Sequence, residues 1–402
     1  MHLVNPMASY IVSTLIVTSA NQLAGALDST KQYLIDGAID MGAQSITVPT
    51  GGLSIAGLGF GISSLTSSEN SYNMFVTEGG SYSGNLFING VDLGATGTSS
   101  QIFELDNDGN FGAVEFRNGN YLASSTIGNL DNYRQYLQSN VAVFAITDGL
   151  TFTGAWAGGA AIIDTVCIGV GAGVSIFKAG VGLVFSGSIR SNINALSINA
   201  TTTVFDWATG NIANDGAFFL DGSRFNPASN PIPNISSSDV KARFRNCSGI
   251  NNTYVGAAWE VTASAATSIA SANTLYKMAG TTTYSEEHWF SNSTNNACVY
   301  DSTIGIEAEV DFSLSFTGGN NDVMGVQIRQ WDNSASSYVD IGPRHTATLN
   351  GGPSGVRAEN ISGFAFATLA QNDRIEVWIE NQSDTTNITT DAAGSLIVKQ
   401  RS

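Results

Sequence analysis

The sequence predicts an all-β protein in which a parallel β-helix is followed by an antiparallel jelly-roll β-sandwich. Helical periodicity is scarce, and short apolar bursts separated by Gly, Asn, Asp and Ser fill most of the chain. After about residue 302 the pattern becomes a regular two-residue alternation. We expect an N-terminal attachment or cap segment at residues 1–32, a β-helix body at 33–300 and a jelly-roll tip at 301–402.

The N-terminal segment contains the best helical pattern, from Ser19 to Gln32, where Leu23, Ala26 and Leu27 form a short apolar stripe. The first coil of a β-helix exposes an apolar end that must be capped, and a short helix before Tyr33 would cap it.

The body contains apolar bursts that are too short for most sandwiches and are often about ten residues apart. Such strands fit a solenoid whose coils of roughly 20 to 30 residues stack their apolar faces. The bursts are Ser45–Val48, Leu53–Ile55, Leu86–Ile88, Gln101–Leu105, Ala113–Phe116, Leu150–Phe152, Ile162–Ile163, Val174–Phe177, Leu183–Phe185, Leu196–Ile198, Val204–Phe205 and Phe218–Leu220.

The tip is predicted from alternation. Ile306–Phe316 has an apolar residue at every second position, as do Met324–Ile328 and Ile375–Ile379, and Arg374, Glu376, Trp378 and Glu380 fall on the opposite face of the last strand. About eight short strands in a hundred residues imply a β-sandwich. For Asn246–Ser302, final coils, a neck with strand exchange and a part of the tip remain open alternatives.

The composition restricts the class of protein. The chain has 402 residues, 43% hydrophobic and 12% charged, with 16 basic and 33 acidic side chains and a formal net charge of −17. That charge repels nucleic acid and anionic membrane surfaces. The apolar run Tyr10–Val17 lacks the flanks of a signal peptide, and Ser, Thr and Gly interrupt every run before membrane-spanning length. We expect an extracellular protein made without a signal peptide, with no membrane insertion.

The end of the chain resembles a C1q/TNF-like jelly roll. The resemblance lies in Gln371–Asn381, followed by Ile388–Thr389 and Leu396–Val398, and in Ile361–Leu369. It covers roughly the last quarter of the chain. In phage fibre proteins such tips pack as three copies about one axis, so the resemblance implies a homotrimer.

The opening coils, Tyr33–Gly42, Ile46–Pro49 and Leu53–Gly57, resemble those of pectin-lyase-like β-helices in phage tail spikes and fibres. This resemblance implies a right-handed β-helix and a virion context, and it assigns no chemistry.

Catalytic candidates exist if the protein is a depolymerase, because such enzymes cleave with Asp or Glu pairs beside sugar-stacking aromatic rings. The candidates are Asp148, Asp164 and Asp206, near Trp156 and Trp207. No spacing links the three carboxylates, so turn and surface positions are the favoured interpretation.

No cofactor or metal is expected. Asp106–Asn110 has calcium-type oxygen ligands, but its Gly stands too early for an EF-hand loop. His2, His288 and His345 are not at ligand spacing. Cys167, Cys247 and Cys298 are expected to be buried and reduced.

The expected function is a non-enzymatic virion surface protein, a tail fibre or spike that mediates adsorption to a host surface polysaccharide or receptor. Its other expected partners are virion structural proteins. Exposed aromatic rings and polar loops would bind the ligand, with Asp332–Tyr338 and Asn350–Gly355 as the candidate loops. A capsid head fibre or decoration protrusion and a polysaccharide depolymerase tailspike are the alternatives.

Overall fold

The computed structural model describes residues 11, 13–77, 83–107, 112–123, 126–226, 230–292, 296–349, 359–392 and 394–401, and the side chains at 285–288 and 359 fall outside this description. Two compact units divide the chain, residues Met1–Thr253 and Tyr254–Ser402. Strands dominate both units, and the described helices are the short 3-10 helices η1 (Ala20–Leu23) and η2 (Thr209–Asn211). The all-β prediction is confirmed.

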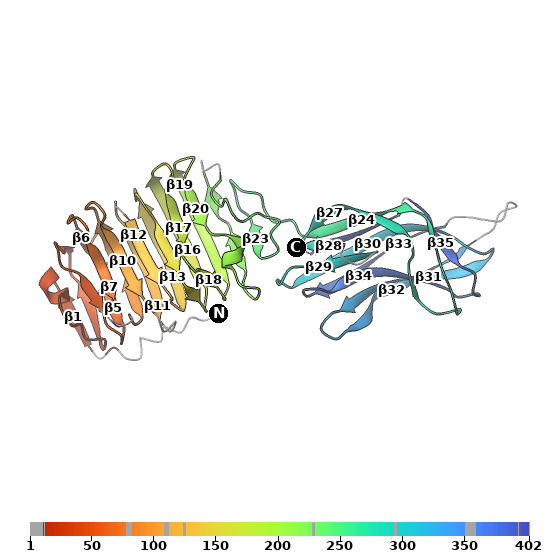
Figure 1. Ribbon diagram of the computed structural model, residues 1–402, viewed down its shortest axis with the longest axis horizontal. Coiled ribbons are helices and arrows are strands. Elements are labelled where there is room, and N and C mark those ends of the chain that lie inside the picture. The colour runs from red at the N-terminus through yellow and green to blue at the C-terminus, as the bar shows by residue number, and fades with distance from the viewer. Residues whose placement is uncertain are drawn as a thin grey trace. The chain divides into compact units, whose positions relative to one another are not determined.

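Unit 1 is a parallel β-solenoid, and its rungs follow one another in Figure 1. Sheet A has the strand order β1 (Ser13–Val17), β2 (Lys31–Ile35), β5 (Leu53–Gly57), β8 (Leu86–Asn89), β11 (Ala113–Tyr121), β13 (Gln135–Phe144), β16 (Ala160–Val170), β19 (Ile189–Ile198), β21 (Phe218–Asp221) and β23 (Ala242–Arg245), with β3 (Ala38–Asp40), β6 (Ser64–Ser67), β9 (Asp92–Ala95) and β22 (Arg224–Phe225) beside this path.

Sheet B forms a second side of the solenoid. Its strands are β4 (Ile46–Val48), β7 (Asn73–Thr77), β10 (Gln101–Asp106), β12 (Thr126–Asp131), β14 (Leu150–Thr153), β17 (Ser175–Ala179) and β20 (Thr203–Asp206). The small sheet C pairs β15 (Ala155–Trp156) with β18 (Val184–Phe185).

Apolar side chains stack in register along the solenoid because equivalent positions of successive coils pair directly. Hydrogen bonds between coils join residues 22 to 31 positions apart, which is the coil length that the sequence predicts. One inward column runs along sheet A through Leu53, Leu86, Val114, Tyr136, Ala160, Ile189, Phe218 and Ala242, all of them buried.

The N-terminal segment differs from its prediction. Strand β1 pairs in register with β2, so the solenoid begins at Ser13 and not after residue 32. The predicted helix over Ser19–Gln32 is reduced to the single turn η1, because β2 already takes up Lys31 and Gln32. Leu23 is nevertheless buried in the solenoid core, and Leu27 packs against that core.

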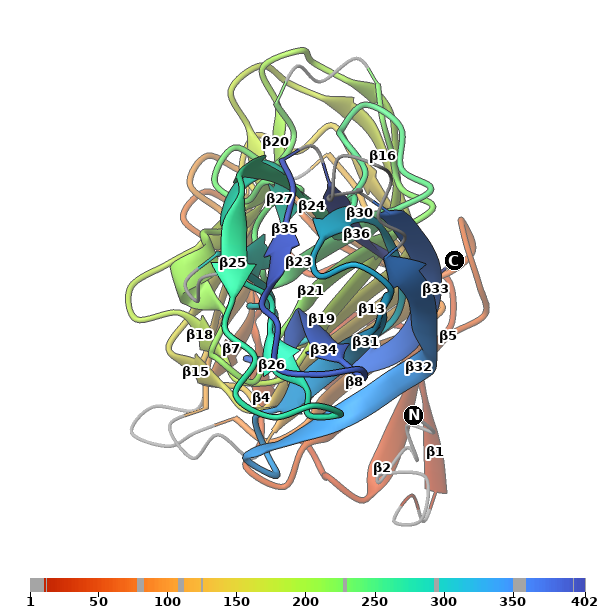
Figure 2. The same ribbon diagram turned by 90° about the vertical axis from the view of Figure 1, so that its right-hand side faces the viewer.

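Unit 2 is an antiparallel sandwich of two sheets. Sheet D contains β24 (Gly256–Ala263), β25 (Ala265–Thr267), β27 (Thr281–His288), β30 (Ile306–Thr317), β33 (Glu359–Leu369), β35 (Ile388–Thr390) and β36 (Ser395–Gln400). Sheet E contains β26 (Tyr276–Lys277), β28 (Phe290–Ser291), β29 (Ala297–Tyr300), β31 (Asp322–Asp332), β32 (Ser337–Leu349) and β34 (Arg374–Asn381). Figure 2 shows both sheets of this unit.

The chain passes between the two sheets of unit 2 in a jelly-roll-like pattern. Strands β29, β31, β32 and β34 belong to sheet E, while β30, β33 and β36 belong to sheet D. The alternation that predicted β30 is confirmed, since every second residue from Ile306 to Phe316 is buried. Met324, Val326 and Ile328 of β31 and Ile375, Val377 and Ile379 of β34 are buried as well.

The boundary between body and tip lies earlier than predicted. Strand β24 pairs with both β27 and β36, so the chain has entered sheet D by Gly256. The predicted boundary at residue 300 therefore falls inside unit 2. Of the three alternatives for Asn246–Ser302, membership of the sandwich applies from Tyr254 onward.

Two further sequence expectations concern burial. Cys167, Cys247 and Cys298 are buried and form no disulfide, as predicted. Within the described parts of the chain, no helix has both the length and the apolar character needed to cross a membrane.

Candidate functional site

The carboxylates proposed from the sequence do not converge. Asp148 forms an ion pair with Lys178, whose Nζ lies 2.7 Å from each carboxylate oxygen. Lys178 is also the strand partner of Asp206, whose Oδ1 accepts a hydrogen bond of 3.0 Å from Asn234 Nδ2. A cation therefore separates the two carboxylates, whereas a glycosidase pair flanks a shared bond.

Asp164 occupies a structural position on sheet A. Strand β16 pairs with β13, where Ile163 is the partner of Ser139 and Thr165 is the partner of Val141. Asp164 therefore stands opposite Asn140. Asn140 donates to Asn118, and Asn118 donates to Asn89, each over 2.8 Å. Asn118, Asn140 and Asp164 all have positive φ, near 50°. Asn and Asp tolerate this left-handed conformation best, which explains the carboxylate without catalysis.

Trp156 and Trp207, which the sequence places near these carboxylates, lie in the solenoid core. Both side chains are fully buried. Their rings pack against Phe152, with centroid distances of 5.1 Å and 5.6 Å, and against Phe185. Neither ring presents a face to a sugar, so the stacking groove that a depolymerase would need is not built from these residues.

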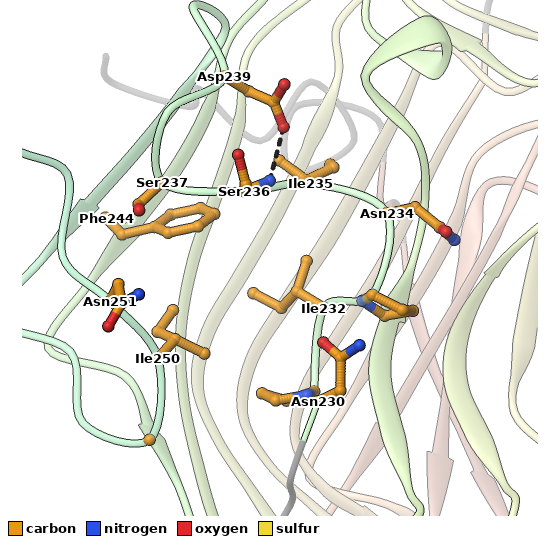
Figure 3. A pocket seen from close by; sticks show the side chains of 13 residues that line it. Asn230, Ile232, Asn234, Ile235, Ser236, Ser237, Asp239, Phe244, Ile250 and Asn251 are labelled. Carbon is orange, nitrogen blue, oxygen red and sulfur yellow. Dashed lines mark hydrogen bonds between the residues drawn. The ribbon is translucent and has the colours of Figure 1, made fainter. Parts of the chain in front are cut away.

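A hollow of about 580 Å³ lies near the C-terminal end of the solenoid and is drawn in Figure 3. Apolar side chains that belong to the end of the core line it, among them Ile232, Ile235 and Phe244. The only titratable side chain in its lining is that of Asp239, whose Oδ2 accepts a 2.6 Å hydrogen bond from the Ser236 amide. We interpret this hollow as a gap in the packing of the last coil.

The strongest candidate is a cluster of aromatic and cationic side chains on sheet E, which we call the aromatic face. It consists of Trp331, Tyr338 and Trp378 together with Arg329 and Arg374. In the central strand β34, Ile375, Val377 and Ile379 are buried, so the alternation of a β-strand places Arg374 and Trp378 on the opposite side.

Strand register brings the aromatic face together. Trp331 pairs with Tyr338 across the β31–β32 hairpin and with Arg374 on the other side. Arg329 lies two residues before Trp331 on β31, and Trp378 lies four residues after Arg374 on β34, where it is the partner of Gln327. All five side chains are half-buried.

The three rings pack edge to face. The Tyr338 ring lies 4.9 Å from Trp331 and 4.8 Å from Trp378 between centroids, at interplanar angles of 65° and 64°. Edge-to-face contact is favoured by the ring quadrupoles, and such pairs are worth about 0.5–1.5 kcal/mol beyond their burial. The array is consequently held in place before any ligand arrives.

Guanidinium groups cover part of the rings. Arg329 Cζ lies 5.1 Å from the Tyr338 centroid and 4.7 Å from that of Trp378, while Arg374 Cζ lies 4.8 Å from Trp331. These are cation–π distances. Arg329 Nε also donates to Asp340 Oδ1 over 2.7 Å, which fixes this guanidinium against the aromatic face.

A buried carboxylate lies beneath the aromatic face. Glu376 has no exposed side-chain surface, and its two oxygens accept hydrogen bonds from Lys277 Nζ at 2.9 Å and from Trp378 Nε1 at 3.0 Å. Burial, followed by the nearby Glu376 carboxylate, raises the pKa of Tyr338, so its hydroxyl keeps its proton at neutral pH.

This arrangement is suited to binding a sugar. A pyranose packs its C–H face on an aromatic ring, and guanidinium N–H groups donate to hydroxyl or carboxylate oxygens. Glu376 and Asp340, two acidic groups of this region, already accept hydrogen bonds from Lys277 and Arg329. The aromatic face is therefore the candidate binding site of unit 2.

The sequence predictions identified this site only in part. The candidate loop Asp332–Tyr338 ends on one ring of the aromatic face, whereas Asn350–Gly355 lies outside the described residues. Trp331 and the two arginines were missed. The usable signal was Trp378, a large aromatic residue on the strand face opposite to Ile375, Val377 and Ile379.

Metal sites add nothing to this assignment. Among the residues that the structure describes, no cluster of three or more His, Cys, Asp or Glu side chains could hold a metal ion. The possible calcium loop Asp106–Asn110 lies only partly within the described residues.

Comparison with protein families and with curated proteins finds no match. Among solved structures, the chain is similar to the Eiger TNF of S. frugiperda at 6% identity, over 37% of this chain and 93% of that one, with a TM-score of 0.29. Murine APRIL at pH 5.0 is similar at 10% identity, over 36% of this chain and 98% of that one, with a TM-score of 0.26.

Fold and site together define a class: a two-unit all-β protein with a parallel solenoid, a jelly-roll-like sandwich and an aromatic face on one sheet of the sandwich.

Proposed function

We propose that this protein is a non-enzymatic adhesin that binds a surface glycan through the aromatic face of its sandwich. The observation that carries the proposal is the preformed array of Trp331, Tyr338 and Trp378, with Arg329 and Arg374 against the rings. Ring faces supply stacking, and the guanidinium groups supply directed donors. Such a rigid aromatic array loses little conformational freedom when it binds a ligand.

The proposed setting is the surface of a bacteriophage particle, where the protein is a tail fibre or spike that adsorbs the particle to its host. The low charge content, the acidic balance and the combination of a solenoid with a jelly-roll-like sandwich support this setting. Its partners there are other structural proteins of the particle and the glycan of the host. Labelling particles with an antibody to this chain tests the setting. A signal on the head would indicate a head protrusion instead of a tail fibre.

Purified protein mixed with extracted host polysaccharide tests the binding function, provided that binding and polymer length are followed in the same samples. We expect binding without shortening. Trp378→Ala should weaken binding at least tenfold, because central aromatic residues dominate such surfaces. Phe60→Ala, which removes an exposed ring from unit 1, should leave binding unchanged. Shortening of the polymer would overturn the non-enzymatic assignment and favour the depolymerase.

Self-association into a homotrimer is part of the proposal. Phe364, Phe366 and Ile397 on sheet D are 54%, 47% and 40% exposed, and the two phenyl rings lie 5.7 Å apart. Burying this apolar patch between copies would remove it from water. Light scattering should give the mass of three chains, and Phe366→Ser should shift it towards one. A monodisperse wild-type monomer would contradict the trimer.

A further inference from the structure

A second hollow, of about 540 Å³, lies on the lateral face of the solenoid and is lined from strands β16, β19, β21 and β23. Its lining holds three arginines, Arg190, Arg243 and Arg245, and a single carboxylate, Asp221. This is a local cationic excess in a chain of net charge −17 with 16 basic side chains in all. Its volume is in the range that holds small-molecule ligands.

Register places the basic side chains on the first and third of three consecutive rungs. Arg190 of β19 pairs with Phe219 of β21, which pairs with Arg243 of β23. Phe218 and Leu220, the neighbours of Phe219, are buried in the core, so the alternation directs this column outward. Figure 2 shows β19, β21 and β23 side by side.

Two cations of this hollow are exposed, and one of them is held against an aromatic ring. Arg190 and Arg245 are exposed. Arg190 Cζ lies 5.5 Å from the centroid of the half-buried Phe219 ring, which positions the guanidinium. Asp221 is the strand partner of Arg245, and its Oδ1 accepts a hydrogen bond from Asn246 Nδ2 over 3.1 Å.

We propose that this hollow, the arginine groove, is a separate binding site for an acidic polysaccharide, whose sugar carboxylates would pair with the guanidinium groups. Guanidinium forks bind carboxylates with two parallel hydrogen bonds. Arg190 and Arg243 are two strands apart, about 9.6 Å at normal strand spacing. This spacing is comparable to the length of a disaccharide, so alternate acidic sugars of one polymer would meet successive arginines.

Other polyanions fit the protein less well. A nucleic acid brings a dense row of phosphates along its whole length, and the surplus of acidic residues in this chain repels it outside the groove. A polyuronate carries only one carboxylate on each sugar ring, with neutral hydroxyl groups between the charges. The half-buried Phe219 ring between two arginines also offers an apolar contact for a sugar.

The test is calorimetric titration of the full chain with an acidic oligosaccharide, tetragalacturonate, and with a neutral one, maltotetraose. Binding of tetragalacturonate that weakens with added salt is expected. Arg190→Gln and Arg245→Gln should each reduce the affinity about tenfold or more, the loss expected for a hydrogen bond to a charged group. Arg224→Gln, which removes an exposed arginine of β22 outside the groove lining, should change nothing.

Specific outcomes would overturn the proposal. Equal affinity for the two oligosaccharides would do so, as would wild-type affinity in the Arg190→Gln, Arg245→Gln double variant with an unchanged melting temperature. If inorganic phosphate bound as tightly as tetragalacturonate, the groove would be a simple anion site. If a short DNA duplex did so, the groove would be a nucleic-acid site. Trp378→Ala should leave tetragalacturonate binding intact, so a failure of the aromatic face and a failure of the arginine groove are distinguishable.

Discussion

Removing the lysine that neutralises the buried Glu376 should destabilise the sandwich more than removing any exposed lysine. Lys277 Nζ lies 2.9 Å from Glu376 Oε1, and the exposed fractions of the two side chains are 29% and 0%. Lys277→Met keeps most of the aliphatic stem and removes only the charge. The variant leaves a buried carboxylate without its cation.

The magnitude follows from the burial of this pair. Breaking a fully buried ion pair costs about 3–5 kcal/mol. Because Lys277 is partly in water and Trp378 Nε1 still donates to the other oxygen of Glu376, we expect about 3 kcal/mol, the lower end of that range. For a unit of about 150 residues this lowers the melting temperature by roughly 6–12 °C.

Calorimetry of the full chain measures this change in the transition of unit 2. Lys399→Met is the matched control, because Lys399 likewise pairs with carboxylates, those of Glu309 and Asp311, but is 42% exposed. It should leave the transition almost unchanged. Adding Glu376→Gln to Lys277→Met should recover part of the loss, since no unpaired charge then remains. Equal shifts for the two lysine variants would refute the reasoning.

Three further changes probe other parts of the chain. Burial raises the pKa of Cys167 to about 12, so Cys167 in unit 1 should resist thiol reagents until that unit unfolds. Cys298 in unit 2 should also resist until its own unit unfolds, because its side chain is fully buried, and mass spectrometry of labelled peptides can follow both. Gly128→Ala should cost about 3 kcal/mol in urea unfolding, because φ is +123° and a Cβ would lie 2.0 Å from a backbone oxygen of the neighbouring rung. Gly173→Ala, with φ +71° and open space, should cost only about 1 kcal/mol. Burial raises the pKa of Asp301, so the folded state holds this proton more tightly than the unfolded state does. The charged carboxylate therefore destabilises the fold, and this destabilisation is complete above the folded pKa. Asp301→Asn should gain stability over the wild type as pH rises from 3 to 7, and a gain independent of pH would contradict this.

The elements that sequence alone predicted are those with a strong period. The alternation of Ile306–Phe316 and the short apolar bursts each determine which side chains are buried, and burial is the dominant energy in both units. The strand Ser13–Val17 was missed because an apolar run at a chain end has no local partner. It becomes a strand only by pairing with Lys31–Ile35.

The binding site was less predictable, because it depends on register. Trp331, Tyr338 and Trp378 come from three strands, and no local spacing relates Trp378 to the other two. Polar alternation also misled, since it assigned Glu376 to a polar face and the structure buries it completely beneath Lys277 and Trp378. Tertiary contacts, not periodicity, determined both outcomes.

The direct pairing of equivalent residues in successive coils makes the solenoid modular. Phe177 stacks on Phe205 of the next coil at 5.5 Å, and Phe75 stacks on Phe103 in the same way at 5.6 Å. Each coil therefore presents to its neighbour a surface much like the one it receives. Insertion or loss of one whole coil outside β16–β23 would preserve the stacking on either side, so the length of unit 1 can change in evolution without altering the arginine groove.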